Sequence, residues 1–289
     1  MSQAGTVVAA FGRQYEIELE GGALALCYPR GKKSHVACGD RVTVELSAPD
    51  HGVIAAVAPR STLLYRSDAY RRKLFAANAT QAVIVVAAEP GFSDELVTRC
   101  IVAAEQQHMR VAIVLNKIDL AGKAETARRQ LAPFLALGYA VVELSATRNA
   151  EAIRPLLAGQ CSVLVGQSGM GKSTLINALL PHVQAATREI SDTLDSGKHT
   201  TTHTRLYRLD AASSLIDSPG MQEFGLAHLT RAEMEQGFRE FLPYLDKCRF
   251  RDCRHDREPD CALRTAVLQG RISANRLDQF HKLCASCGK

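Results

Sequence analysis

A glycine-rich segment in the second half of the chain has the spacing of a phosphate-binding loop. It fits the pattern G-x-x-x-x-G-K-[ST], follows an apolar run at 162–165 and precedes a helix-like segment, which is the context that this pattern requires. Glycines let backbone N–H groups turn inward around phosphate oxygens, and the helix N-terminus adds a favourable dipole. We expect Lys172 to reach the β- and γ-phosphates and the Ser173 hydroxyl to bind Mg²⁺. The nucleotide-binding loop comprises Gly166, Gln167, Ser168, Gly169, Met170, Gly171, Lys172, Ser173 and Thr174.

A second motif indicates which base the nucleotide carries. The sequence N-K-I-D stands at the end of the apolar run 111–115. Asp119 can accept hydrogens from the ring N–H and the exocyclic amine of guanine, a pair that adenine does not offer, and leaving it unpaired is costly. By itself this motif fits a solvated turn, but S-A-T follows the next apolar run and offers a backbone N–H to the guanine carbonyl. The predicted base-binding residues are Asn116, Lys117 (its stem along the base), Ile118, Asp119, Ser145, Ala146 and Thr147.

A third set of residues could bind Mg²⁺ and sense the γ-phosphate. Asp217, in the sequence D-S-P-G after a short apolar stretch, is expected to hold Mg²⁺ through water, and the Gly220 N–H to contact the γ-phosphate. One threonine of the upstream T-T-T tract should complete the Mg²⁺ shell, and we choose Thr201. The residue after D-S-P-G is Met221, which cannot orient an attacking water. We therefore predict His228 as a catalytic group beside Lys172 and Thr201; an ordinary surface histidine is the alternative.

Three cysteines and a histidine cluster near the C-terminus with the spacing C-x₄-C-x-H-x₅-C. Three thiolates and one imidazole suit a closed, tetrahedral structural zinc site. Reduced cysteines in a hydrophobic core are the alternative, but the segment 249–260 is too polar for a core. The predicted zinc ligands are Cys248, Cys253, His255 and Cys261. A later pair, Cys284 and Cys287, lacks partners and is expected to be free thiols near a frayed tail.

The elements that must position these motifs fall into three predicted domains, at 1–62, 63–228 and 229–289. The first contains four or five short alternating strands with glycine turns, which favours a small closed β-barrel of the oligonucleotide-binding (OB) type, or a barrel that only spaces domains. A polar, basic connector at 60–77 follows. The second alternates buried strands with helices, which predicts an α/β fold with a parallel sheet covered on both faces. The third is a helical, zinc-binding module whose last helix runs through about 272–283.

The order of the motifs is rotated. Ordinary GTPases run from the phosphate loop through both switches to N-K-x-D and S-A, whereas here N-K-I-D and S-A-T come first. The same sheet can be built with its ends rejoined elsewhere, because domain termini often lie close together. The fold class predicted is therefore a circularly permuted P-loop GTPase domain between a barrel and a zinc module.

Composition bounds the class of protein. The 289 residues are 46% hydrophobic and 22% charged, as expected for a soluble globular chain, and no apolar run reaches the roughly 18 residues of a membrane span. The first residues do not resemble a signal peptide, so we expect a cytoplasmic protein, and nothing demands more than a monomer. Residues 1–75 carry 10 Lys and Arg against 7 Asp and Glu, and 229–289 carry 12 against 9. This excess is either scatter or a surface for a polyanion such as RNA.

Together, N-K-I-D, S-A-T, G-Q-S-G-M-G-K-S-T, D-S-P-G-M-Q-E-F-G and the cysteine cluster closely resemble the RsgA (YjeQ) family of circularly permuted bacterial GTPases. The resemblance covers nearly the whole chain. It implies a GTP hydrolase that acts in late maturation of the small ribosomal subunit, is stimulated by that subunit, binds ribosomal RNA through its flanking domains and leaves on hydrolysis.

Two other functions compete with this one. The first is a GTP-sensing switch that binds a protein partner and barely hydrolyses GTP, which would explain methionine at position 221. Salt-sensitive binding to RNA would distinguish the RNA-associated GTP hydrolase from this switch. An ATPase is disfavoured by N-K-I-D.

Overall fold

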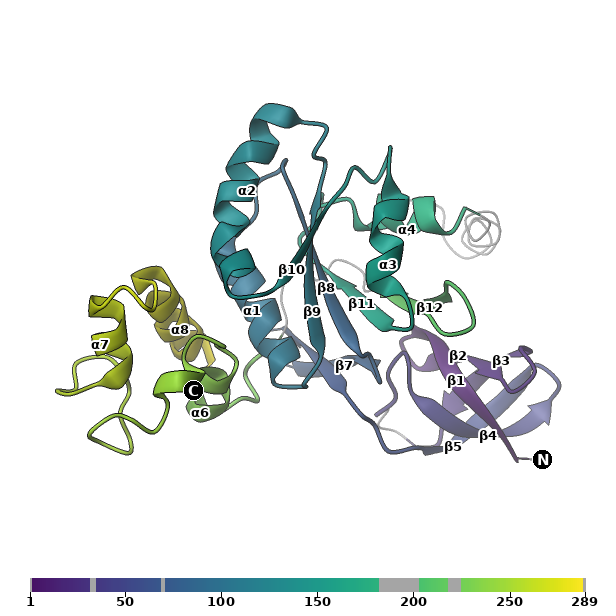
Figure 1. Cartoon of the computed structure of the whole chain (residues 1–289). Coiled ribbons are helices and arrows are strands. Elements are labelled where there is room, and N and C mark those ends of the chain that lie inside the picture. The colour runs from purple at the N-terminus through teal and green to yellow at the C-terminus, as the bar shows by residue number, and fades with distance from the viewer. Residues whose placement is uncertain (1, 32–34, 69–70, 182–202, 218–224, 288–289) are drawn as a thin grey trace.

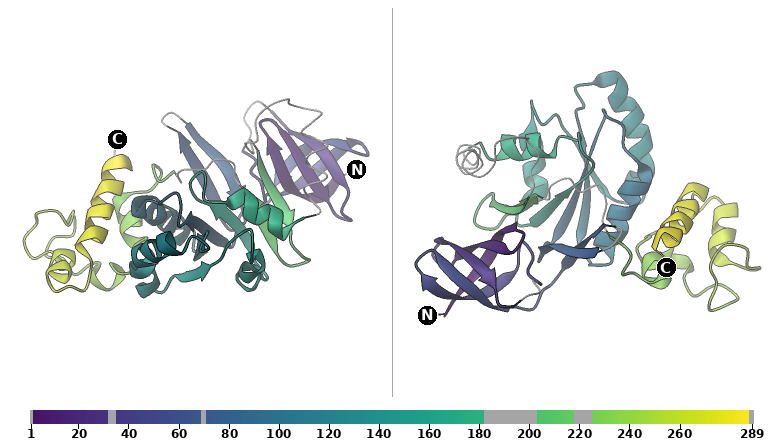
Figure 2. Two further views of the ribbon diagram at one scale, coloured as in Figure 1. Left: turned by 90° about the horizontal axis from the view of Figure 1, so that it is seen from above. Right: turned by 180° about the vertical axis from the view of Figure 1, so that it is seen from behind.

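The computed structural model describes residues 2–31, 35–68, 71–181, 203–217 and 225–287. The chain forms an N-terminal barrel, a central α/β domain and a C-terminal helical module. The barrel and the helical module lie on opposite sides of the central domain in every view (Figure 1, Figure 2). No helix within the described ranges is long and apolar enough to cross a bilayer.

The N-terminal barrel closes by pairing its first strand with two others. Its strands run in the order β1-β2-β3-β5-β4, with β1 paired to β4 as well as to β2. Alternation along each strand sends one set of side chains inward, where Val7, Ile17, Cys27 and Val44 are fully buried. The strands are β1 (Ser2–Phe11), β2 (Gln14–Leu19), β3 (Leu24–Pro29), β4 (Arg41–Ala48) and β5 (His51–Val57). The predicted barrel is confirmed.

The central domain has a sheet in the order β10-β9-β8-β11-β13-β12, parallel except for β12. All seven residues of β8 are buried, as expected for a strand covered on both faces. The strands are β8 (Gln81–Ala87), β9 (Arg110–Asn116), β10 (Ala140–Glu143), β11 (Cys161–Val165), β12 (Thr204–Arg208) and β13 (Ser214–Asp217). The helices are α1 (Asp94–Glu105), α2 (Ala121–Ala136), η1 (Ala150–Ile153), α3 (Arg154–Leu157) and α4 (Lys172–Leu179).

This strand order explains how a rotated motif order can build one site. β9 and β10, which come early in the chain, lie on one side of β8. β11 and β13, which come late, lie on its other side. Because parallel strands end at the same edge of the sheet, the loops after all of these strands meet there. The predicted circular permutation is confirmed in the sheet.

Strand pairing and ion pairs join the barrel to the central domain. β1 pairs antiparallel with β12, so the two sheets are continuous. At the same boundary the fully buried Asp40 carboxylate accepts two hydrogen bonds from Arg60, at 2.6 and 2.7 Å. The connector that follows is more ordered than the sequence suggested, because it contains a two-stranded sheet of β6 (Leu63–Asp68) and β7 (Arg71–Ala77).

The C-terminal module packs against α1 (Figure 1). The Thr98 hydroxyl, fully buried on α1, receives a hydrogen bond from Arg276 at 2.6 Å and donates one to Gln279 at 2.7 Å. Arg239 pairs with Glu105 at 2.6 Å. The module contains α6 (Arg231–Gln236), η2 (Leu242–Tyr244), α7 (Ala262–Leu268) and α8 (Ala274–Cys287). The last helix, α8, extends beyond its predicted end at about 283 and includes the segment that was expected to fray. Cys284 in this segment is half-buried and packs against the core.

Candidate nucleotide site and metal centre

The phosphate-binding loop connects β11 to α4 and depends on two glycines. Gly166 has φ +146°, and a Cβ there would lie 2.2 Å from the Val85 carbonyl oxygen. Gly171, the residue before α4, has φ +88°, and a Cβ there would lie 2.3 Å from Asn116 Nδ2. Both positions therefore require glycine, because the backbone φ is positive and a Cβ atom would clash with a neighbouring atom.

Lys172 lies inside this loop with only 9% of its surface exposed. Its ammonium donates hydrogen bonds to the carbonyl oxygens of Gly166 and Gln167, the latter at 2.9 Å. Burial lowers the pKa of Lys172 below its usual value, and the nearby charge of Asp217 opposes that shift. Asp217 ends β13 and is itself 5% exposed. The structure thus brings the loop lysine and the predicted Mg²⁺-binding carboxylate to the same edge of the sheet.

Asn116 ties the base-recognition segments to the phosphate loop. Its side chain is 1% exposed at the end of β9. Nδ2 donates to the Met170 carbonyl at 2.9 Å, and Oδ1 accepts from the Ala146 N–H at 2.9 Å. Oδ1 also accepts from the Lys117 N–H at 2.8 Å. One amide therefore joins the loops after β9, β10 and β11.

Asp119 is exposed at this edge, next to the S-A-T segment. A hydrogen bond from the Ser145 hydroxyl lowers the pKa of Asp119 below its usual value, so the group is a carboxylate at neutral pH. Lys117, at φ +61°, directs its ammonium to the carbonyls of Glu89 and Gly169, at 2.7 and 2.8 Å. The Asp119 carboxylate, which can only accept hydrogen bonds, is thus exposed at the edge where the sequence predicts guanine recognition.

The other residues predicted to bind the nucleotide differ in their exposure, and some lie outside the described residues. Ser168, Ser173, Thr174 and Thr147 are exposed at the loop edge, whereas Ile118 is half-buried. Thr201, Gly220 and Met221 lie outside the described residues.

His228 lies beside the β6–β7 sheet. Its half-buried ring packs on that of Tyr65, with the centroids 4.7 Å apart and the planes 43° from parallel. The Gly225 N–H donates to the Tyr65 carbonyl at 3.2 Å in the same region. The ring is therefore held by a neighbour that the sequence did not predict, since Tyr65 belonged to the expected connector.

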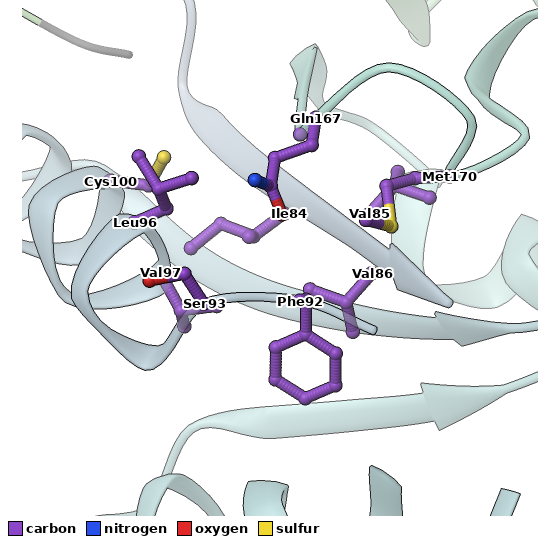
Figure 3. Close-up of a pocket in the computed structure, with 11 residues that line it drawn as sticks. Ile84, Val85, Val86, Phe92, Ser93, Leu96, Val97, Cys100, Gln167 and Met170 are labelled. Carbon is purple, nitrogen blue, oxygen red and sulfur yellow. The ribbon is translucent and has the colours of Figure 1, made fainter. Parts of the chain in front are cut away.

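A small pocket behind the phosphate loop was also not predicted (Figure 3). It lies between β8, α1 and the loop, and its lining is almost entirely apolar. Gln167 points into it, and its Oε1 atom is buried with no hydrogen-bond partner in the part of the chain that is described. An apolar lining does not suit a triphosphate, although Gly166, Gln167 and Met170 of the phosphate loop form one wall of the pocket.

The four predicted metal ligands come together in the C-terminal module, with their donor atoms all within 4.8 Å of one another. Cys248 Sγ lies 3.9 Å from Cys261 Sγ, and His255 Nδ1 lies 3.6 and 3.3 Å from these two sulfurs. Cys253 completes the cluster. His255 turns its other nitrogen, Nε2, to Glu235 Oε1 at 3.3 Å. The cluster can hold a metal ion, with Glu235 orienting the imidazole.

Glu235 is a residue that sequence reasoning missed. It stands on α6, twenty residues before His255, and no spacing rule joins the two. The available signal was only the capping box of Thr230 and Glu233, which fixes where α6 begins.

Comparisons with known proteins agree with this geometry. Residues 57–227 match the sequence profile of a family described as RsgA GTPase. The chain is 52% identical to the small ribosomal subunit biogenesis GTPase RsgA of Nitrosospira multiformis, over 98% of this chain and 90% of that protein. It is 53% identical to the protein of the same name from Burkholderia pseudomallei, over 94% and 88%.

Solved structures show the same architecture. YjeQ from Thermotoga maritima superimposes with a TM-score of 0.76 at 28% identity, covering 100% of both chains. The circularly permuted GTPase YloQ shares the fold, with a TM-score of 0.72 over 99% of this chain and 95% of that one, at 24% identity. The profile covers more than half of the chain, and relatives at about half identity cover nearly all of it. The chain therefore belongs to the RsgA GTPase family.

Proposed function

We propose that this protein is a cytoplasmic, monomeric GTP hydrolase that acts in late maturation of the small ribosomal subunit. The observation that carries the proposal is the Asn116 amide, which joins the loop of Lys172 to the segments holding Asp119 and Ser145. A phosphate cradle and a guanine-specific acceptor thereby share one edge of the sheet. The relatives whose names state this role match nearly the whole chain.

Each residue at the edge has a role in this proposal. Asp119 accepts the two guanine hydrogens as a carboxylate, the form that its lowered pKa favours. Lys172 exchanges its bonds to loop carbonyls for the β- and γ-phosphate oxygens, and nearby phosphate charge offsets the burial that lowers its pKa. Ser173 and Thr201 would contribute hydroxyls to Mg²⁺, and Asp217 would hold it through water. Bound Mg²⁺ neutralises charge that develops on the phosphates.

His228 is proposed as the group that aligns or receives a proton from the attacking water, since Met221 cannot do so. In this structure its ring rests on that of Tyr65. His228→Ala is expected to keep GDP affinity and lose stimulated hydrolysis. Unchanged stimulated turnover would remove it from the mechanism.

The metal cluster is proposed to hold one structural zinc ion. A tetrahedral zinc with Zn–S of about 2.3 Å and Zn–N of about 2.0–2.1 Å separates its donors by about 3.5–3.8 Å. The separations of 3.3, 3.6 and 3.9 Å among Cys248, His255 and Cys261 bracket this range. Four protein ligands leave no open position, which fits structure rather than catalysis.

The test is steady-state GTP hydrolysis with and without purified small ribosomal subunits, with large subunits as the control. We expect stimulation by small subunits alone and release of the protein after hydrolysis. Salt-dependent binding to ribosomal RNA through the flanking domains should accompany it. Intact GTP binding without stimulation by either subunit would refute the proposal and favour a switch that binds a protein partner.

A further inference from the structure

The outer face of β3 carries three apolar side chains in a row. Along this strand Ala25 and Cys27 point into the barrel and are buried, so Leu24, Leu26 and Tyr28 point outward. Leu24 is 52% exposed and Tyr28 is 44% exposed, although both are large and apolar. The middle residue, Leu26, is half-buried. A barrel strand that faces water on its outer side normally carries polar residues there, so this row requires an explanation.

The Tyr28 ring is restrained by a hydrogen bond from the neighbouring strand β2. Gln14 on β2 donates a hydrogen bond from Nε2 to the Tyr28 hydroxyl at 2.8 Å. On the other side Tyr28 is the register partner of Val53 on β5. A side chain that is already restrained loses less entropy when a ligand covers it. The ring is therefore presented as a fixed, flat surface.

The charges around this row favour an anionic partner. Arg13, exposed in the β1–β2 turn, donates to the Gly31 carbonyl at 3.0 Å and so lies at the Tyr28 end of the strand. The two acidic side chains of β2 are each matched by an arginine of β12: Glu16 pairs with Arg205, and Glu18 with Arg208. The acidic groups of β2 that would repel a phosphate backbone are thus neutralised.

We propose that Tyr28 stacks an unpaired base of single-stranded RNA, with Leu26 and Leu24 packing under the next nucleotide. The faces of strands 2 and 3 are where OB-type barrels bind oligonucleotides, and aromatic rings there stack successive bases. Duplex RNA does not expose its base faces, so the site selects an unpaired segment. The row is one strand wide, which is small beside the ~800 Å² per partner of a stable protein interface. This inference rests on the proposed function, since the RNA is that of the small subunit.

The test measures binding of a fluorescein-labelled single-stranded oligouridylate to the full-length protein by fluorescence anisotropy. Tyr28→Ala is expected to weaken binding about 5- to 150-fold, the range for loss of one stacked base. Tyr28→Phe keeps the ring and loses only the bond to Gln14, so it should remain within about threefold of the unmodified protein. Leu135→Ala, a similarly exposed apolar residue on α2, is the matched control and should change nothing. GDP affinity verifies that each variant is folded.

Two further readings distinguish stacking from other causes. The slope of log affinity against log salt should be the same for Tyr28→Ala as for the unmodified protein, because stacking releases no counterions, whereas Arg13→Ala should reduce it by about one. With small subunits, Tyr28→Ala should raise the concentration needed for half-maximal stimulation of GTP hydrolysis. RNA affinity equal to that of the unmodified protein overturns the inference. If subunit binding alone is weakened, the partner of this face is a ribosomal protein, and the inference is likewise wrong. Absence of stimulation in the unmodified protein refutes the proposed function instead.

Discussion

Replacing Asn116 by alanine should separate the two halves of the nucleotide site. The change removes the donor to the Met170 carbonyl and the acceptor for the Ala146 N–H, both of which are buried. Each buried group left without a partner costs about 1–3 kcal/mol, so the total is about 2–6 kcal/mol. Since 1.4 kcal/mol corresponds to a factor of ten, the lower value reduces GDP affinity by about 30-fold if the loops meet only in the nucleotide-bound protein. If the loops stay together in the free protein, part of the loss will appear as lower stability.

The assay pairs a titration with fluorescent GDP and urea unfolding followed by circular dichroism. Asn149→Ala is the matched control. Asn149 Oδ1 accepts a hydrogen bond from the Ser145 N–H at 2.6 Å in the same loop, but its side chain is exposed. That control should lose less than about tenfold in affinity, because water can replace an exposed partner. An Asn116→Ala protein with unchanged affinity and unchanged unfolding free energy would refute the bridging role.

Three other variants test the remaining arguments. Gly171→Ala forces a side chain into φ +88° and within 2.3 Å of Asn116 Nδ2, so GDP affinity should fall more than about tenfold in the same titration; a smaller loss would show that the loop can shift. Cys261→Ser should lower bound zinc measured by mass spectrometry and the midpoint of thermal unfolding, as should chelation of the unmodified protein; full zinc occupancy would exclude this ligand. Arg60→Met removes the counterion of the buried Asp40 carboxylate, which keeps only the hydrogen bond from the Ala37 N–H, and should cost about 3–5 kcal/mol in urea unfolding. Adding Asp40→Leu should restore part of that loss, and equal instability of the double variant would contradict the unpaired-charge explanation.

The elements that the sequence predicted well are those whose signal is local. β8 is a continuous apolar run buried along its whole length, and the motif residues follow such runs directly. Their convergence needed only the rule that parallel strands end at one edge. The metal cluster was predictable for the same reason, because its four ligands span 248–261.

The features that were missed depend on partners distant in sequence. β7 begins with Arg71 and two more basic residues, which indicates a solvated linker until its antiparallel partner β6 is known. Asn116 was predicted as one residue of a base-binding motif. Its bond to Met170, 54 residues away, could not be read from either segment. The same holds for Glu235 and the ring of Tyr65, whose partners lie on other elements.

The pairing of β1 with β12 has a consequence for the solubility of the chain. Without the barrel, β12 would be the last strand of the central sheet, with a row of N–H and C=O groups open to any extended segment. Such edges promote aggregation unless they are covered or charged. Here the covering strand comes from the same chain, and the ion pairs of Arg205 and Arg208 lie across the seam. The barrel thus covers the start of this open edge, at Thr204 and Arg205, whatever else its outer face binds.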